Sequence, residues 1–182
     1  LDWDRSRFDI EFGLRNGTTY NSFIIKGSKT AVIDTSHSKF KDLWLDELVE
    51  QLDPQNIDFL ISSHTEPDHS GLISDLLDLN PDITIVGSKI ALKFIEDLIH
   101  KPFKRLEVKS GEYLDLGSNL DSKIDHKIEF ISAPNLHWPD TIFSFDHGTN
   151  ILYTCDAFGL HYCSNDFFDI DQKEIFKDFR FY

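Results

Sequence analysis

Methionine is absent from this sequence of 182 residues, which begins at Leu1, and we therefore interpret it as a fragment of a longer protein. Cysteine occurs only at Cys155 and Cys163, too few for a disulfide framework. Two cysteines fit the reducing environment of the cytoplasm, where we expect the protein to reside. We expect both thiols to pack in the interior, because free cysteine is among the most buried residue types.

Long apolar runs are also missing, and no signal-peptide pattern opens the chain, so no membrane span is expected. Basic side chains are scarce: 18 Lys and Arg stand against 32 Asp and Glu, which gives a net charge of −14. Nucleic acid is therefore not expected as a partner, because phosphate binding needs clustered basic residues. Hydrophobic residues still make up 40% of the chain, enough for one globular domain over residues 1–182.

The hydrophobic pattern alternates between strand and helix along the first half of the chain. Strands are predicted at residues 18–26, 30–34, 57–62, 83–86, 106–108, 113–116, 127–132, 141–145 and 151–154, and helices at residues 39–52, 70–79 and 88–99. The strands on either side of Gly111 are expected to form a short antiparallel pair, and the tail at residues 169–182 begins with a helical pattern. This order of elements favours a layered α/β fold.

The strongest chemical signal is the run from His64 to His69, which places four candidate metal ligands within six residues. These ligands are His64, Glu66, Asp68 and His69, and they follow directly after a predicted buried strand. Active sites of α/β proteins lie at such strand ends. The alternative is a solvated polar loop whose residues cap the next helix. Burying so many imidazoles and carboxylates without a cation is costly, so the sequence favours two adjacent metal positions.

Two later segments place further ligand types at strand ends. His137 stands in Leu-His-Trp-Pro-Asp-Thr before a predicted strand, and Asp156 follows the strand that ends near Thr154. Taken singly, His137 is typical of a structural histidine, and Asp156 of a turn or helix cap. If their strand ends face the same way as that of His64, all three belong to one site.

Together these motifs resemble one known family, the flavodiiron proteins. The pattern His-x-Glu-x-Asp-His from His64, the segment around His137 and the Asp-Ala-Phe-Gly segment from Asp156 are similar to that family's ligand motifs. The resemblance covers residues 17–164. The segments at residues 137–146 and 153–163 are most similar in sequence to the cyanobacterial diflavin branch. It implies a metallo-β-lactamase-like αββα sandwich, incomplete at its C-terminus, that holds two iron ions.

The resemblance also implies a ligand set. The implied ligands of one iron are His64, Glu66 and His137, those of the other are Asp68 and His69, and the implied bridge is Asp156. In this family the second iron takes a further histidine from downstream, which is expected beyond Tyr182. Independently of the family, Glu66 is a harder oxygen ligand than the histidine that dizinc hydrolases of this fold carry, and this favours a redox-active metal over zinc.

The implied activity is reduction of dioxygen to water at the diiron centre, or of nitric oxide to nitrous oxide, with electrons from FMN and ultimately NAD(P)H. FMN belongs to a flavodoxin domain that this sequence lacks, as it lacks the flavin-reductase domain of the cyanobacterial branch. In the family the flavin comes from the partner subunit of a head-to-tail homodimer or heterodimer, so the isolated fragment is expected to be inactive.

Two other functions stay open from the sequence. One is a dinuclear hydrolase in which metal-bound hydroxide attacks an ester or thioester, although Glu66 argues against it. The other is a non-catalytic structural or dimerisation module with an incomplete site. The full-length sequence would separate the oxidoreductase from the hydrolase, because only an oxidoreductase of this kind needs a flavodoxin-like segment downstream.

Several residues are expected to support the ligands without binding metal. Asp34 and Asp140 are candidate hydrogen-bond partners of the ligating histidines, and Trp138 is expected to pack beside them. His161 follows Asp156 closely and is a candidate for a role behind the ligands, near the open coordination positions; the alternative is ordinary packing. Four histidines are interpreted as surface residues, namely His37, His100, His126 and His147.

Overall fold

The computed structural model describes residues 1–7, 13–14, 16–166 and 168. The chain divides into two compact units, one formed by residues 21–157 and the other by residues 1–20 with 158–182. Every named helix and strand of the described residues lies in the first unit. The tail for which the sequence predicts a helix, residues 169–182, lies outside the described residues.

The first sheet has five strands in the order β1-β2-β3-β4-β5. Its members are β1 (Phe23–Lys26), β2 (Thr30–Ile33), β3 (Phe59–Ile61), β4 (Thr84–Gly87) and β5 (Lys104–Glu107). The first pair is an antiparallel hairpin, and β2 to β5 run parallel to one another. The central strands are short apolar runs because both faces of the sheet are covered.

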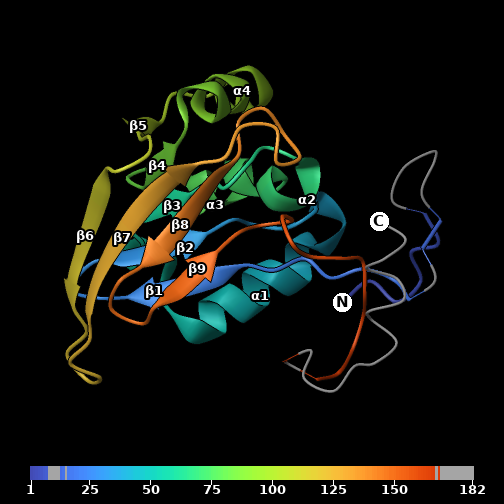
Figure 1. Ribbon diagram of the computed structural model, residues 1–182, viewed down its shortest axis with the longest axis horizontal. Coiled ribbons are helices and arrows are strands. Elements are labelled where there is room, and N and C mark those ends of the chain that lie inside the picture. Colours follow the sequence, from blue (N-terminus) through green and yellow to red (C-terminus); the bar gives the residue numbers. More distant parts are fainter. Residues whose placement is uncertain (8–12, 15, 167, 169–182) are drawn as a thin grey trace. The chain divides into compact units, whose positions relative to one another are not determined.

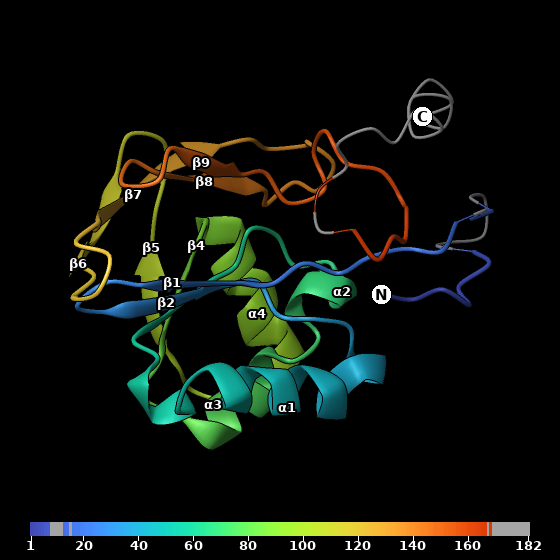
Figure 2. The ribbon, with the colours of Figure 1, turned by 90° about the horizontal axis from the view of Figure 1, so that it is seen from below.

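Helices cover one face of this sheet (Figure 2). They are α1 (Lys41–Gln51), α2 (Pro67–Ser70), α3 (Ile73–Leu79) and α4 (Lys89–Ile99), with single 3-10 turns at Ser38–Phe40 and Pro54–Asn56. Apolar side chains of α3 and α4, among them Leu76 and Ile95, are fully buried in one cluster with Leu60 and Ile85 of the sheet. Ser88 caps α4, since its hydroxyl accepts a hydrogen bond from Ala91 N at 3.1 Å.

The second sheet lies against the other face of the first (Figure 1). It is an antiparallel meander of β6 (Tyr113–Ser118), β7 (Asp125–Ser132), β8 (Ile142–Asp146) and β9 (Ile151–Tyr153). Ile33, Ile61 and Val86 of the first sheet share a buried core with Ile128 and Phe130 of the second. The described residues therefore form three of the layers of the expected αββα sandwich, namely helices, sheet and sheet.

The pairing predicted around Gly111 is wrong. Strand β5 pairs in parallel with β4, whereas β6 pairs with β7 in the other sheet. Gly111, at φ 82°, lies in the turn that carries the chain from one sheet to the other. Local pattern marks both strands correctly, but the choice of partner depends on residues distant in the sequence.

Two boundaries also differ from the prediction. The first strand begins only at Phe23, and Thr18 instead forms an isolated bridge with Asp2 in the other unit. The polar run is not loop throughout, because residues 67–70 form one helical turn with Pro67 at its start, the position that proline prefers. Of the helices in the described residues, none has the length and apolar character that a membrane crossing requires.

Candidate dinuclear metal centre

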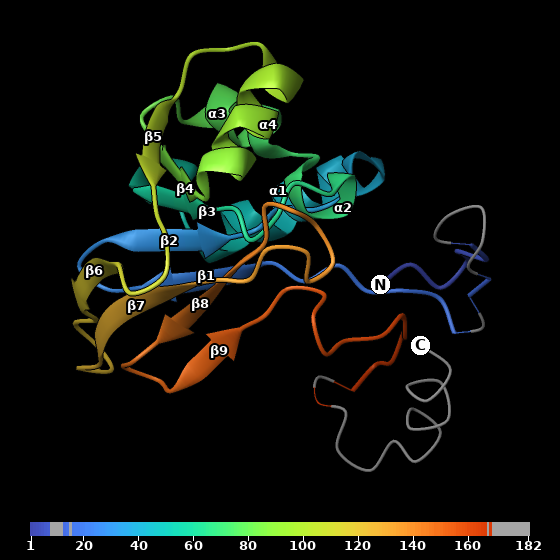
Figure 3. The ribbon, with the colours of Figure 1, turned by 45° about the horizontal axis from the view of Figure 1, so that its top comes forward.

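The candidate ligands come from loops at one edge of the two sheets. Strands β2, β3 and β4 are parallel, so their carboxyl ends share an edge, and the chain leaving β3 leads directly to His64. Ile142 N, at the start of β8, donates a hydrogen bond of 2.8 Å to Ser63 O. This bond joins the second sheet to the loop after β3, and Figure 3 shows the loops that follow β3 and β7 coming together near α2.

Hydrogen bonds hold the polar run in a fixed shape. The hydroxyl of Ser70 donates to Thr65 O at 2.9 Å and to Glu66 O at 3.0 Å. Gly71 follows α2 at a point where a Cβ would lie 2.4 Å from Pro67 O, so only glycine fits there. The ligands therefore stand on a rigid turn.

A first cluster of four donor atoms forms around Glu66. Its Oε2 lies 3.3 Å from His64 Nε2 and 2.6 Å from His137 Nε2. Asp156 Oδ2 completes the group, 3.5 Å from His64 Nε2 and 3.8 Å from His137 Nε2. All four atoms lie within 4.8 Å of one another, a spacing in which a single ion can contact them all.

A second group of donors lies around His69 on the other side of the Asp156 carboxylate. His69 Nε2 is 2.9 Å from Asp156 Oδ1 and 3.8 Å from Asp68 Oδ2. Asp156 thus turns one oxygen to each group. Asp68 Oδ1 is buried and has no hydrogen-bond partner within the described part of the chain. An unpartnered buried carboxylate oxygen in this position fits a cation that would contact it.

The protonation of the buried histidines depends on the carboxylates. Burial opposes a positive charge on His64, but hydrogen bonds with Asp156, Cys155 and Glu66 outweigh it and raise the pKa of His64 to about 12. Burial likewise opposes a charge on His69, and the same carboxylate with Asp34 raises its pKa well above the ordinary value. In the metal-free chain, protons thus occupy the positions that divalent cations would take.

The pKa values of the three carboxyl groups shift in two directions. Burial opposes ionisation of Asp156, yet its hydrogen bonds with His64 and His69 hold its pKa well below the usual range. The pKa of Glu66 is also lowered by its two histidine partners, against the effect of burial. Burial dominates at Asp68 and raises its pKa. Imidazole nitrogens mixed with carboxylate oxygens are a donor set that suits iron and other first-row divalent metals.

Of the two carboxylates expected behind the ligands, Asp34 is confirmed. Its Oδ2 lies 3.3 Å from His69 Nδ1, and its Oδ1 accepts a hydrogen bond of 2.7 Å from Ser63 N. The prediction for Asp140 is wrong. Its backbone oxygen accepts a hydrogen bond from Ser88 Oγ, but both of its side-chain oxygens are buried without a partner among the described residues.

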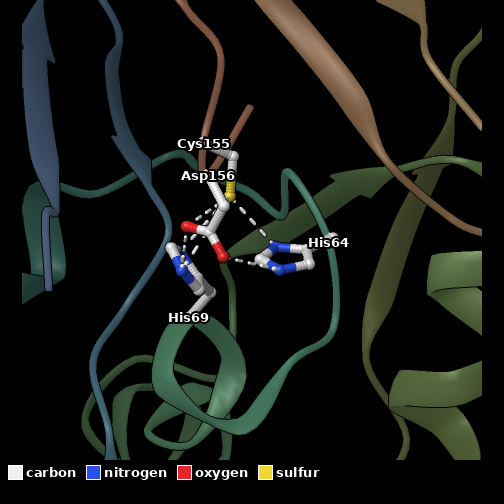
Figure 4. A group of neighbouring side chains, drawn as sticks. All are labelled: His64, His69, Cys155 and Asp156. Atoms are coloured by element: carbon white, nitrogen blue, oxygen red, sulfur yellow. Dashed lines mark hydrogen bonds and ion pairs between the residues drawn. The ribbon is translucent and has the colours of Figure 1, made fainter. Parts of the chain in front are cut away.

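Cys155 was expected only to pack in the interior, but its thiol lies against the candidate ligands. The sulfur lies 3.0 Å from His64 Nδ1 and 3.4 Å from His69 Nδ1 (Figure 4). Only its position directly before Asp156 could have indicated this. Cys163 is buried as expected, and its thiol donates to Thr18 O at 2.8 Å.

The predictions for the remaining aromatic residues and histidines are confirmed in one case, wrong in another and untested in a third. Trp138 packs beside the site as predicted, with its ring centroid 5.9 Å from that of His64 and an edge-on orientation. His126 is not a surface residue, because it is buried and its Nδ1 lies 2.7 Å from Asp146 Oδ2. His161 belongs to the other unit, where its Nδ1 lies 3.0 Å from Thr18 Oγ1. Its role near the ligands stays a prediction.

The fold and the motifs together place the chain in a known class. Two packed sheets with helices on one outer face are three of the four layers of the metallo-β-lactamase αββα fold. The family model "ODP family beta lactamase" matches residues 18–180, most of the chain, and the chain therefore belongs to this family.

Similar curated proteins carry flavin or diiron in their names. Diflavin flavoprotein A 1 of Synechocystis is 59% identical over 182 residues, all of this chain but 31% of that protein. The anaerobic nitric oxide reductase flavorubredoxin of Vibrio vulnificus is 36% identical over 180 residues, 96% of this chain and 35% of its own length. The chain thus spans about a third of the length of these relatives.

Solved structures of flavodiiron proteins have the same fold. A metal-soaked Flv1 flavodiiron core from Synechocystis matches with a TM-score of 0.88 and 32% identity, over 98% of this chain and 44% of the other. The rubredoxin oxygen:oxidoreductase of Desulfovibrio gigas matches with a TM-score of 0.84 and 30% identity, over 97% of this chain and 42% of the other.

Proposed function

We propose that this chain holds the diiron centre of a flavodiiron-type oxidoreductase. The proposed ligands are His64, Glu66 and His137 for one iron, Asp68 and His69 for the other, and Asp156 as the bridge. The observation that carries the proposal is the placement of Asp156, whose two oxygens face two separate groups of donors. A carboxylate that bridges two ions holds them roughly 3.5–4 Å apart.

The proposed reaction is reduction of dioxygen to water, with nitric oxide as the other candidate substrate. Two ferrous ions held by these residues would supply two electrons and reduced FMN two more, enough to reduce dioxygen fully. The names of the relatives support both substrates, since one is an oxygen oxidoreductase and another a nitric oxide reductase.

The residues of this chain would prepare the site rather than perform covalent chemistry. Asp34 accepts the Nδ1–H of His69 and so directs its Nε2 toward the bridge. His64 is 1% exposed, whereas the side chain of His137 is 54% exposed and that of Asp156 is 35% exposed. The open side of the centre is therefore next to His137, and a diatomic substrate would approach there.

Electron delivery is proposed to come from outside the described residues. FMN would be bound by a flavodoxin-type part of the longer protein and would be supplied across a head-to-tail homodimer or heterodimer. The coverage of the relatives supports this, because diflavin flavoprotein A 1 has more than twice the length of this chain beyond the matched part.

Metal content per chain is the experiment that tests the proposal. The chain is purified without oxygen and reconstituted with ferrous iron in competition with zinc. Close to two irons per chain is the expected result, whereas two zincs with iron excluded would favour the dinuclear hydrolase. The control is His147→Ala, because this histidine is exposed and pairs with Glu129 outside the cluster. Glu66→Ala is expected to lose iron and the control to retain it.

A further inference from the structure

The two buried histidines of the candidate centre present opposite edges to two different sets of atoms. Their Nε2 atoms face the carboxylates of Glu66 and Asp156. Their Nδ1 atoms are the nitrogens nearest to the sulfur of Cys155, at 3.0 Å from His64 and 3.4 Å from His69, whose Nε2 lies 4.0 Å from the sulfur (Figure 4). One thiol therefore stands behind both histidines.

Metal binding decides which of these atoms carries a proton. A neutral histidine that binds a metal through Nε2 keeps its proton on Nδ1, and this N–H needs an acceptor. At His69 the acceptor is Asp34 Oδ2, 3.3 Å away. At His64 the acceptor is the sulfur of Cys155, which is the one partner recorded for this nitrogen among the described residues.

The thiol also connects the two histidines to one carboxylate. Cys155 Sγ lies 3.6 Å from Asp34 Oδ2, to which it donates, and Asp34 is itself fixed by Ser63 N. Cys155 has a left-handed backbone, with φ 55°, and directly precedes Asp156. Figure 4 shows both side chains directed at the histidines, so the bridge and the thiol are placed by one turn of the backbone.

We infer that Cys155 is a positioning residue of the metal centre: it accepts the Nδ1–H of His64, and so fixes the ring with Nε2 toward the metal, without ligating metal itself. The inference rests on the proposed function, because it assigns Nε2 of His64 to a metal. It gives His64 a partner equivalent to the one that Asp34 gives His69.

Geometry separates this role from ligation of an ion held by His64 and Glu66. The sulfur also lies 4.0 Å from His69 Nε2 and 3.9 Å from Asp156 Oδ1, so the cobalt spectrum decides whether it contacts an ion beside His69. Cys155 belongs to a compact group with His64, His69 and Asp156, but it is not in the group that contains Glu66 and His137. The sulfur meets His64 at Nδ1, the edge opposite to the one that faces Glu66. A metal held by the Nε2 edge and Glu66 would have the imidazole ring between itself and the sulfur.

Cobalt and ferrous affinities of three variants test the inference. Cys155→Ala removes the acceptor and is expected to weaken metal affinity by about 10- to 100-fold, the usual effect of losing a partner of a ligating histidine. Cys155→Ser keeps an acceptor and is expected to retain most of the affinity. Cys163→Ala is the matched control, since this buried thiol donates to the backbone oxygen of Thr18 and lies outside the candidate centre, and it is expected to bind metal as the unmodified chain does.

The outcomes separate cleanly. Equal affinity of Cys155→Ala and the parent chain would overturn the inference and leave the proposed function standing. Equal losses in the Ala and Ser variants would assign Cys155 to packing alone. A sulfur-to-cobalt charge-transfer band in the parent chain that disappears in Cys155→Ser would make the thiol a ligand. If the parent chain binds no metal, the proposed function and the inference both fail. Should Cys155→Ala not fold, the cobalt spectrum and the Ser variant still decide.

Discussion

At the scale of single residues, a few side chains of the candidate centre each contact two different groups. Asp156 turns its two oxygens to two groups, and Asp34 binds both a histidine and a backbone amide. The cluster of candidate ligands from His64 to His69 could be predicted because these residues are close in sequence and chemically conspicuous. The part of Cys155 could not, because a single thiol has no local signature and its contact with His64 exists only after the sheets pack.

Replacing the bridge is expected to empty both metal positions. Asp156→Ala removes one oxygen from each group of donors, so metal content should fall from about two ions per chain to less than one. Elemental analysis after reconstitution measures this. Asp82→Asn is the control, an acidic residue that is 82% exposed and pairs with Lys104 on the surface. Loss of only one ion in Asp156→Ala would show that the carboxylate serves a single metal.

Because the pKa of His64 is raised, metal affinity should increase with pH, whereas the stability of the folded chain without metal should decrease. Protons compete with metal for this residue below its pKa of about 12, so affinity should increase with pH, by about tenfold per unit for each proton released. In the metal-free chain the folded pKa exceeds the unfolded value of 6.5. The stability from this histidine is therefore complete below 6.5 and is lost as pH rises toward 12. Metal titrations and urea unfolding from pH 6.5 upward measure the two trends, and parallel trends would contradict the assignment.

At the scale of elements, the turn between β8 and β9 is held by one buried carboxylate. Asp146 is fully buried and accepts hydrogen bonds from His126 at 2.7 Å, Gly148 N at 3.0 Å and Thr149 Oγ1 at 2.7 Å. Strand and helix positions could be predicted from periodicity, because each element buries its own apolar face. The pairing of β5 with β4 could not, because the choice of partner strand depends on residues that are distant in the sequence.

Asp146→Ala is expected to lower the free energy of unfolding by about 1–3 kcal/mol, since it leaves His126 buried without its partner. Burial opposes ionisation of Asp146, but its three hydrogen bonds lower its pKa below 3.8. Its contribution is thus present above 3.8 and lost as pH falls through the lower folded value. Urea unfolding at neutral and acid pH tests this. The control His147→Ala, an exposed residue of the same turn, should change stability by less than about 1 kcal/mol.

At the scale of the whole molecule, the family match and the geometry of the site agree, and the chain spans about a third of the length of its relatives. The ODP family match covers most of the chain, yet the chain covers only 31% of diflavin flavoprotein A 1. A layered α/β fold could be predicted because alternating strands and helices must bury their faces on each other, whereas the αββα order followed only from the family resemblance. The division into two units could not, because no change of composition marks residue 21 or residue 157.

Packing of the core between the sheets is expected to affect metal affinity, although the core does not contact the metal positions. Phe130 is fully buried between them, so Phe130→Ala should cost about 3–5 kcal/mol of stability. Because the ligands come from both sheets, the same variant should also weaken metal binding. Thermal unfolding and metal titration measure both effects, with Leu120→Ala as the control at a position that is 89% exposed. Unchanged metal affinity in a destabilised Phe130→Ala would show that the loops hold the site without the sheets.

His64 and Asp156 stand far apart in the sequence and follow strands of different sheets, β3 and β9, yet their side chains face one point. An ion bound there would act as a reversible cross-link, and cross-links over long stretches of chain restrict the unfolded state most. Iron supply would then determine the lifetime of the protein as well as its chemistry. Cells short of iron would hold chains that open more often and are degraded sooner by proteases.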